Sequence, residues 1–261
     1  MKSKELDQFY TKHLIAMECY KQLLEFMKLN KINNTFWLEP SAGSGAFYSL
    51  LPKNRLGIDL EPKIDGVICH DFLTYPLERN DYLTIGNPPF GKNSSLAIKF
   101  FNKCALYSNV IAFVLPKTFK KASTLKKLNK QFHLCHEYDL PDFSFEFESK
   151  EYNVPSVFQI WVKSDSPRLN FKAVVTHEDF IFTTKEKSNL AIQRVGNAAG
   201  TVKEIFSHCA VSSHYFINST EEVKNIFKKI NWNSVKYNTA GNPSISKPEL
   251  ISLYNQEKAK V

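Results

Sequence analysis

The amino-acid sequence predicts an α/β protein, with helices on both faces of a largely parallel sheet and a smaller lobe at the C-terminus. Three observations lead to this fold class. Short apolar runs alternate with helical patterns and turn signals as far as Lys163. The run at 109–115 is continuously apolar after its first Asn, as expected for a strand buried on both faces. Beyond Lys163 the alternation stops, so we expect residues 164–261 to form a separate lobe.

The strands that we expect, in chain order, lie at 35–39, 55–59, 66–71, 82–86, 109–115 and 157–162. A helix is expected at 94–108, because Leu96, Phe100 and Cys104 recur at the spacing of one buried face. Two further helical patterns lie at 46–51 and 117–130. The chain offers about six residues between the strands at 55–59 and 66–71, whereas a parallel crossover usually needs a dozen or more. Either the connecting helix is reduced to a single turn or one of these strands is misassigned.

Length and composition limit the class of protein. The chain has 261 residues, enough for one large domain or for one domain and a smaller one. The polar, Pro-bearing stretch at 164–168 marks the expected boundary, so we expect domains at 1–163 and 164–261. No apolar run is long enough to span a membrane, and the N-terminal residues lack the apolar stretch of a secretory signal. Five cysteines without a C-x-x-C pair argue against a disulfide framework and favour a cytoplasmic location.

The charge balance points to a polyanionic partner. Lys and Arg number 34 and Asp and Glu 26, which gives a formal net charge of +8 at pH 7. A surplus of this size favours nucleic acid first among possible partners. The segment 117–130 carries six lysines and no acid, and is either a phosphate-contacting face or a solvated helix face. His133 and His136 have no second ligand pair, so we interpret them as structural and expect no metal site.

The segment Glu39-Pro-Ser-Ala-Gly-Ser-Gly45 follows an apolar strand and has glycines at alternate positions. Glycines there let the backbone approach a ligand closely. Asp59 follows Glu39 by 20 residues, at the end of the next strand. In nucleotide-binding α/β folds an acidic side chain at that place meets the ribose hydroxyls. Position 48 is Tyr, so the third glycine of a dinucleotide fingerprint is missing. The site therefore suits a ligand with a ribose and no pyrophosphate.

A second motif, Asn87-Pro-Pro-Phe-Gly91, ends the strand at 82–86. Ligands of open α/β sheets bind outside the carboxyl ends of the strands. Two consecutive prolines stiffen the backbone and lack N–H donors, so carbonyl groups there can accept hydrogen bonds. The amide oxygen of Asn87 is a further acceptor, and Phe90 offers a flat face for stacking. Acceptors beside an aromatic ring fit a planar substrate with an exocyclic amino group.

These two motifs resemble motifs I and IV of the class I S-adenosylmethionine-dependent amino-methyltransferases, particularly the adenine-N6 DNA methyltransferases with an Asn-Pro-Pro-Phe motif. The segment Asp7-Gln-Phe-Tyr-Thr11 resembles motif X of these enzymes, which lies near the methionine end of the cofactor. The order X, I, IV and then a C-terminal lobe is similar to the γ arrangement, in which target recognition is C-terminal. The resemblance covers about residues 5–162 and implies a Rossmann-like class I methyltransferase sheet.

The resemblance implies S-adenosylmethionine as the cofactor. Gly43 and Gly45 would approach its methionine moiety, Asp59 would bind its ribose hydroxyls, and Asp71 with Phe72 would hold its adenine. The family often has Asp at the first acidic position of motif I, and Glu here would hold the turn or the cofactor's amino group. The full set of cofactor-binding residues implied by the resemblance is Tyr10, Thr11, Glu39, Ser41, Gly43, Gly45, Asp59, Asp71, Phe72 and Asn87.

The resemblance also implies a catalytic turn. Asn87 and the carbonyl of Pro88 would hold the target amino group, Pro89 would stiffen the turn, and Phe90 would stack on the base. The later aromatic residue that contacts the flipped base is not marked by the sequence, and Phe143 and Phe145 are both candidates.

The predicted activity is methyl transfer to the exocyclic N6 of adenine in nucleic acid, with DNA favoured over RNA. The amine lone pair is delocalised into the ring, so acceptors placed on its hydrogens would favour the attacking, pyramidal nitrogen. A base inside a duplex would first have to be flipped out. Four alternatives remain: an adenine-N6 or a guanine-N2 methyltransferase of ribosomal RNA, a protein glutamine methyltransferase, or a methyltransferase-like module that binds nucleic acid without catalysis.

Overall fold

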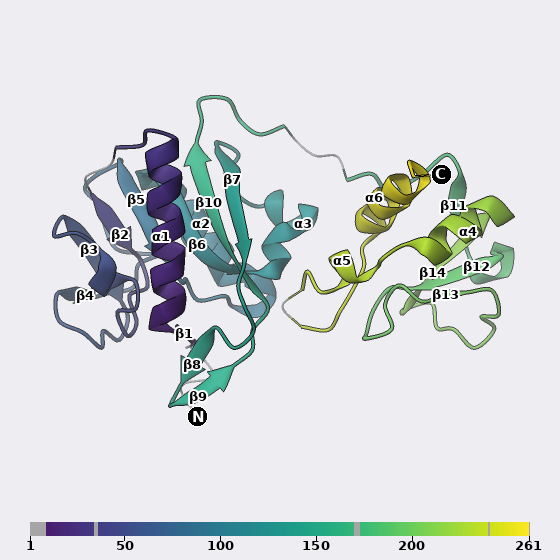
Figure 1. Ribbon diagram of the computed structural model, residues 1–261, viewed down its shortest axis with the longest axis horizontal. Coiled ribbons are helices and arrows are strands. Elements are labelled where there is room, and N and C mark those ends of the chain that lie inside the picture. Colours follow the sequence, from purple (N-terminus) through teal and green to yellow (C-terminus); the bar gives the residue numbers. More distant parts are fainter. Residues whose placement is uncertain (1–8, 34–35, 170–172, 240, 261) are drawn as a thin grey trace. The chain divides into compact units, whose positions relative to one another are not determined.

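The structure, a computed structural model, describes residues 9–33, 36–169, 173–239 and 241–260 (Figure 1). Asp7 and Gln8 of the predicted motif X, and Thr35 of the first predicted strand, therefore lie outside the described residues. The chain forms two compact units, residues 1–170 and residues 171–261. The Arg168 guanidinium donates hydrogen bonds to the carbonyls of Leu125, Leu128 and Asn129, which holds the 164–169 segment against the first unit. The division thus lies seven residues beyond Lys163.

A seven-stranded sheet forms the centre of the first unit (Figure 1). Its order is β4-β3-β2-β5-β6-β10-β7, and β10 is the one strand of this sheet that runs opposite to the other six. Strands β3 and β4 lie on one side of β2, and β5 and the later strands lie on its other side. The strand order therefore reverses between β2 and β5, and ligands of such sheets bind at the carboxyl ends of the strands at this point. The predicted Rossmann-like α/β fold is confirmed by this strand order. The strands are β2 (Trp37–Glu39), β3 (Arg55–Asp59), β4 (Val67–Cys69), β5 (Tyr82–Gly86), β6 (Ser108–Pro116), β7 (Phe132–Asp139) and β10 (Ser156–Lys163).

Two helices cover opposite faces of this sheet. Helix α1 (His13–Leu29) buries Ala16, Cys19 and Leu23 in the same apolar cluster as Ala112 of β6. Helix α2 (Ser95–Tyr107) packs into a second cluster that contains the alternate β6 residues Ile111, Phe113 and Leu115. Because successive strand residues point to opposite faces, the continuously apolar β6 is buried on both sides. Helix α1 was not predicted, although its buried residues recur with helical spacing.

Two predicted helices are wrong. The pattern at 46–51 forms only a 3₁₀ turn, η2 (Tyr48–Leu50), because Pro52 forces the residue before it into an extended conformation. The segment at 117–130 forms a 3₁₀ turn, η4 (Lys117–Lys120), and one helical turn, α3 (Ala122–Leu125), separated by an extended Lys121. Lysines four apart, such as Lys117 and Lys121, repel one another on a helix, which disfavours a continuous one.

The short crossover between β3 and β4 is real. Both strands form, they pair in parallel, and residues 60–66 link them through bends and a turn without a helix. A small separate sheet lies elsewhere in the first unit, in the order β1-β8-β9. It joins β1 (Tyr10–Thr11) to a hairpin of β8 (Phe145–Phe147) and β9 (Lys150–Tyr152), which the sequence did not predict.

The second unit is an antiparallel sheet packed against helices. The sheet order is β11-β14-β12-β13, and the core includes Phe180, Ile217, Phe227 and Leu250. Its elements are β11 (Phe180–Phe182), η5 (Lys185–Lys187), β12 (Leu190–Gln193), β13 (Val202–Lys203), β14 (His214–Ser219), α4 (Glu221–Lys229), α5 (Asn233–Lys236) and α6 (Lys247–Lys258).

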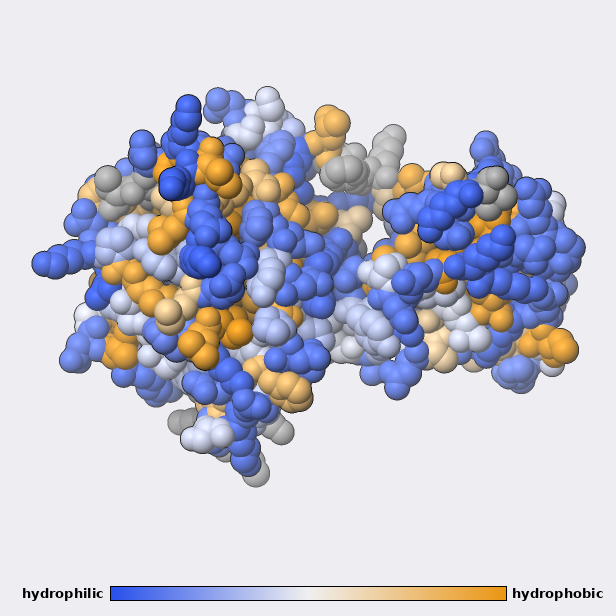
Figure 2. Space-filling model, viewed as in Figure 1, coloured by the Kyte–Doolittle hydropathy of each residue, from blue (hydrophilic) through white to orange (hydrophobic). Residues whose placement is uncertain are grey.

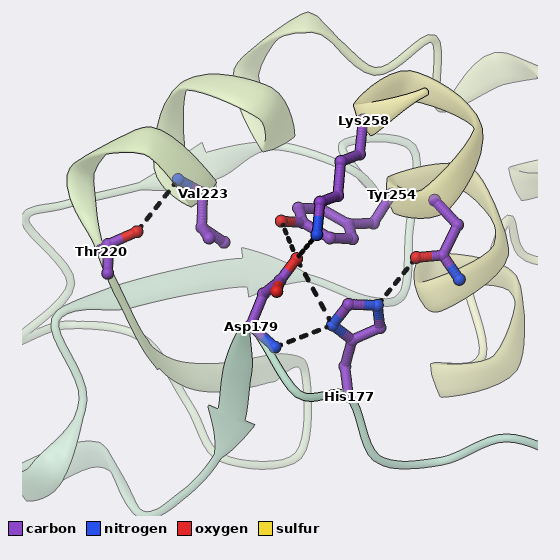
Figure 3. A network of polar contacts seen from close by, with 7 residues as sticks. His177, Asp179, Thr220, Val223, Tyr254 and Lys258 are labelled. Carbon is purple, nitrogen blue, oxygen red and sulfur yellow. Dashed lines mark hydrogen bonds and ion pairs between the residues drawn. The ribbon is translucent and has the colours of Figure 1, made fainter. Parts of the chain in front are cut away.

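Polar contacts fasten α6 to the residues that precede β11 (Figure 3). The hydroxyl of Tyr254 and the ammonium of Lys258 both donate to Oδ2 of Asp179, each at 2.7 Å. His177 stacks on Phe180 with ring centroids 4.8 Å apart, and its Nε2 lies 2.8 Å from Oδ1 of Asn255. His177 and Asp179 therefore help to hold the second unit together.

Polar residues cover most of the molecular face in Figure 2, with hydrophobic residues scattered between them. On α1, for example, exposed apolar residues such as Leu14, Met17 and Leu24 stand among polar ones such as Glu18 and Lys21. Among the described residues, no helix is both long and apolar enough to cross a membrane.

Candidate active site at the carboxyl edge of the sheet

A cavity of about 280 Å³ opens at the carboxyl ends of β2, β3, β4 and β5. Four strand-to-loop turns form its wall together with residues 9–11, which are held in place by β8. The structure therefore brings together three segments that are far apart in the sequence: the predicted motif X, the glycine turn and the Asn-Pro-Pro-Phe turn. The predicted site residues that line the cavity are Tyr10, Thr11, Glu39, Ser41, Gly43, Asp59, Asp71, Phe72, Asn87, Pro88, Pro89 and Phe90.

The glycine turn is tied to the end of β3. The Gly43 N–H donates to Oδ2 of Asp59 at 2.7 Å, and the Glu61 N–H donates to Oδ1 at 2.8 Å. Gly43 has φ +50°, and a Cβ there would lie 2.7 Å from Cε1 of Tyr10, so any larger residue would displace the Tyr10 ring. Gly45 does not line the cavity. At φ +85° it faces Ile64, so it shapes the turn instead of contacting a ligand directly.

Glu39 is a buried carboxyl group at the end of β2, with only 2% of its surface exposed. Burial raises its pKa well above the ordinary value, and the nearby charge of Asp59 adds to this rise, while the backbone N–H of Tyr48 and the charge of Arg55 oppose it. Its Oε2 has no hydrogen-bond partner among the described residues. A buried acceptor of this kind is costly unless a ligand satisfies it.

The turn after β4 presents Asp71 and Phe72 to the cavity. Oδ1 of Asp71 accepts the Leu73 N–H at 2.9 Å, which leaves its other oxygen for a ligand. The ammonium of Lys103, on α2, donates to the carbonyls of Phe72 at 2.6 Å and Tyr75 at 2.7 Å. Burial lowers the pKa of Lys103. Lys103 thus clamps the turn from behind.

Asn87 is oriented by its neighbours. Its Nδ2 donates to the carbonyl oxygen of Phe9 at 2.9 Å, and its own carbonyl accepts from Oγ of Ser41 at 3.0 Å. A carbonyl oxygen only accepts hydrogen bonds, so the amide nitrogen must face Phe9 and the amide oxygen must face the other way. That oxygen, Oδ1, is buried and has no partner among the described residues. Oγ1 of Thr11, which lines the same cavity, is also buried and has no partner among the described residues.

The two aromatic candidates after residue 140 differ in surroundings. Phe145 is fully buried and meets the edge of Phe90, with ring centroids 6.3 Å apart. Phe143 is 51% exposed and has φ +59°, a left-handed conformation that is strained for a side chain of this size. Only Phe143 of the two has a free ring face.

Sequence reasoning missed several residues of the cavity. Glu61 and His70 stand at strand ends beside Asp59 and Asp71, so the same strand-end rule could have found them. Phe100 lines the cavity from α2, and its sequence pattern marks it only as part of a buried helix face. The other residues missed are Phe9, Pro40, Ala42, Ser44, Ala46, Phe47, Leu60, Leu73 and Leu96.

The lysine-rich segment at 117–130 is partly neutralised. Lys117 pairs with Asp139 at 3.3 Å, and Lys120 pairs with Glu137 at 2.9 Å and with Asp139 at 2.5 Å. Nε2 of His136, on β7, lies 2.9 Å from Oε1 of Gln22, so this histidine is engaged with α1. Across the described ranges, no group of three or more His, Cys, Asp or Glu side chains could hold a metal ion.

The residues present fit S-adenosylmethionine. The cofactor carries an ammonium and a sulfonium, and the carboxylates that line this cavity suit positive charge. Those carboxyl groups belong to Glu39, Asp59, Glu61 and Asp71. The unpartnered oxygens of Glu39 and Thr11 are available for the ammonium and carboxylate of an amino acid moiety.

No protein-family model and no curated protein matches the chain. Among solved structures, it is similar to a proposed RNA methyltransferase from Pyrococcus horikoshii, with 18% identity and a TM-score of 0.47 over 61% of this chain and 88% of that one. The 23S rRNA methyltransferase ErmE shares 15% identity, with a TM-score of 0.41 over 63% of this chain and 73% of its own. A proposed methylase from Haemophilus influenzae shares 14% identity, with a TM-score of 0.40 over 58% and 99%. At these identities we infer the function of the chain from its own site.

Proposed function

We propose that the chain is an S-adenosylmethionine-dependent methyltransferase that acts on the exocyclic N6 of adenine in nucleic acid, with DNA favoured over RNA. One observation carries the proposal. The buried Oδ1 of Asn87 has no partner among the described residues, and it lies at the end of β5 beside Phe90, in the cavity that suits the cofactor. An acceptor prepared in this way suits an amino group that must be held while it reacts.

The cofactor would lie along the carboxyl ends of β2, β3 and β4. Asp59 would accept from the ribose hydroxyls while it holds the glycine turn, since a carboxylate can accept about four hydrogen bonds. Asp71 and Phe72 would bind the adenine. The methionine end would be held by residues around the glycine turn and β1, namely Tyr10, Thr11, Glu39, Ser41 and Gly43.

The residues of this chain position the acceptor amine. Bound S-adenosylmethionine supplies an electrophilic methyl group on sulfur. Oδ1 of Asn87 and the carbonyl of Pro88 would accept the two amine hydrogens, which turns the nitrogen lone pair out of the ring plane and towards the methyl carbon. The amine nitrogen would form the new N–C bond while the electron pair of the broken C–S bond stays on sulfur, and the proton that the nitrogen loses would pass to solvent. Alignment of nitrogen, carbon and sulfur would supply much of the rate.

The base itself would be held by aromatic faces. Phe90 lines the cavity next to Asn87, and Phe143 is the exposed aromatic residue two positions before Phe145, whose ring meets Phe90. Stacking between two rings is worth roughly 1–3 kcal/mol per base and tolerates any base. We propose Phe143 as the second stacking residue, and the burial of Phe145 argues against that role for it.

The net charge of +8 favours a nucleic acid over a protein as the acceptor. None of the described residues that line the cavity belongs to the second unit, so we propose that this unit recognises the substrate, as expected for a C-terminal lobe.

The direct test measures transfer of tritiated methyl groups from S-adenosylmethionine to duplex DNA, single-stranded DNA, RNA and protein. Label should enter nucleic acid, DNA most of all, and Asn87→Ala should abolish most of it. Absence of transfer to every acceptor, with intact cofactor binding, would leave a non-catalytic module.

A further inference from the structure

The loop between β13 and β14, residues 204–213 of the second unit, combines exposed apolar residues with surrounding cations. Ile205 and Val211 are 84% and 72% exposed, so this one loop presents two aliphatic side chains to solvent. The loop covers the face of the sheet opposite the helices, where Cys209 and Phe216 form a small apolar cluster with Ala191. The loop is therefore anchored at its centre, and its two aliphatic side chains point into solvent.

Three cations hold this loop from its flanks. The ammonium of Lys185 donates to the carbonyls of Ser207 and Cys209, the latter at 3.0 Å. Nε of Arg194 donates to the carbonyl of Ser212 at 3.2 Å. The carbonyls accept hydrogen bonds from the two cationic side chains but carry no net charge. The positive charges of Lys185 and Arg194 are therefore not neutralised by these contacts. The outer nitrogens of Arg194 remain available to a further acceptor, since its guanidinium has five N–H groups.

The third cation, Lys203, lies against other nitrogen and sulfur atoms. Its ammonium is 3.3 Å from Nε2 of His214 and 3.8 Å from Sγ of Cys209. The pKa of His214 is lowered, first by burial and then by the charges of Lys203, His208 and Lys185. The carbonyl of Ala210, 3.3 Å from Nδ1 of His214, opposes this lowering.

In the part of the second unit that the structure describes, several lysines on the helices are paired with carboxylates, whereas the cations around the loop are not. On the helices, Lys224, Lys258 and Lys260 pair with Glu221, Asp179 and Glu257. Around the loop, neither Lys185, Arg194 nor Lys203 forms an ion pair with any described residue. Glu204 is neutralised by Lys228 at 2.6 Å, and Glu186 accepts hydrogen bonds from its own backbone and from Thr184.

We propose that the β13–β14 loop and the cations Lys185, Arg194 and Lys203 form a surface that binds the sugar-phosphate backbone of nucleic acid. Uncompensated Lys and Arg charges are what phosphates require, and their contacts dominate the affinity of such complexes. The aliphatic side chains of Ile205 and Val211 would pack on sugars or base edges. Two aliphatic residues on a loop, without an amphipathic helix, are a poor anchor for a lipid surface. The proposal rests on the proposed function, because the bound nucleic acid is taken to be the methyl acceptor.

The test measures binding of fluorescent duplex and single-stranded DNA and RNA to the full chain, without cofactor, over a range of salt concentrations. The loop variant is Arg194→Gln with Lys203→Gln. The matched control is Lys229→Gln with Lys260→Gln, which removes the same charge from α4 and the C-terminal end of the chain. The loop variant should lose about tenfold or more in affinity, and its plot of log affinity against log salt should be shallower by about 1.8 for duplex. The control should lose little.

A second variant guards against misfolding. Ile205→Glu with Val211→Glu changes only exposed side chains, so the fold should persist while the new charges repel phosphate. It should weaken nucleic acid binding as the loop variant does. Equal losses in the loop variant and the control, or no loss in either, would overturn the proposal. Binding of the loop variant to vesicles of anionic phospholipid would be measured in the same way. A loop variant that binds these vesicles less well but binds nucleic acid as the parent does would also overturn the proposal.

These outcomes are separate from those of the proposed function. Failure of methyl transfer with normal, loop-dependent nucleic acid binding would overturn the function and leave the surface. Normal methyl transfer with loop-independent binding would overturn the surface and leave the function. S-adenosylmethionine affinity, measured by calorimetry, should be the same in all variants.

Discussion

At the scale of single residues, the site depends on how Asn87 is held. Its amide nitrogen donates a hydrogen bond to the carbonyl of Phe9, which comes from a distant part of the chain. Its amide oxygen has no partner among the described residues and can accept a hydrogen bond from a ligand. The same arrangement makes Asn87 a link between the N-terminal segment and the catalytic turn. Substitution therefore acts both on the acceptor and on the position of β1.

Asn87→Ala should lower kcat by about 10²–10³, the usual effect of removing one preorganised polar group. The affinity for S-adenosylmethionine should change less, because the ribose and adenine contacts lie at β3 and β4. Single-turnover kinetics and calorimetry measure the two quantities. Asn109→Ala, at an exposed position near the start of β6, is the matched control and should behave as the parent. Unchanged turnover in Asn87→Ala would remove this residue from the chemistry.

Phe143→Ala should raise KM for nucleic acid by about 5- to 150-fold, since stacking contributes roughly 1–3 kcal/mol per base. The melting temperature should hardly change, because the side chain is half exposed. Phe143→Gly should lose the same stacking and be at least as stable, because glycine accepts φ +59° without strain. If Phe143→Ala keeps the parental KM, the second stacking residue must be sought elsewhere.

At the scale of elements, the turn after β4 is positioned by α2. Lys103→Met keeps the apolar stem but loses two hydrogen bonds to the carbonyls of Phe72 and Tyr75. We expect about a fivefold weaker affinity for S-adenosylmethionine, from roughly 1 kcal/mol of lost positioning. The value of kcat at saturating cofactor should stay the same. Lys99→Met, exposed on the same helix, is the control, and equal affinities in both variants would show that the clamp does not matter.

The sequence predicts an element correctly where the signal for that element lies within a few neighbouring residues. Strands β3 and β5 match the predicted ranges 55–59 and 82–86 residue for residue, because each is a short apolar run bounded by turn residues. The helix predicted at 117–130 failed because its lysines repel one another and Lys121 is extended. The β8–β9 hairpin was missed because it forms against β1, about 135 residues earlier in the chain. Such long-range pairing leaves no periodic signal in the sequence.

The same distinction holds for the site. Asp59, Asp71 and Asn87 could be found because each follows a strand and strand ends meet at one edge of a parallel sheet. The orientation of the Asn87 amide could not, since it depends on a carbonyl 78 positions earlier. Gly45, expected at the ligand, instead faces Ile64, which the short β3–β4 crossover brings beneath the turn.

At the scale of the whole molecule, the second unit has its own core and its own polar fastening (Figure 3). Hydrogen bonds from Lys258 and Tyr254 hold the pKa of Asp179 below its ordinary value. The folded pKa is lower than the unfolded one, so this stabilisation is complete above the unfolded value of about 4 and is lost as the pH falls through the folded value. Asp179→Asn should therefore lower the melting temperature at pH 7, and the difference from the parent should shrink below about pH 4. Calorimetric melting at several pH values checks this, and a pH-independent difference would contradict it.

In the proposed reaction, Asn87 presents an acceptor to the N6 amino group of adenine. The most direct measurement identifies the methylated atom: nucleic acid incubated with the chain and labelled S-adenosylmethionine is digested to nucleosides and separated by chromatography with mass detection. We expect label in N6-methyladenine nucleosides, more from DNA than from RNA. Label in N2-methylguanine, label confined to protein glutamine, or no label from a chain that binds the cofactor would contradict this expectation.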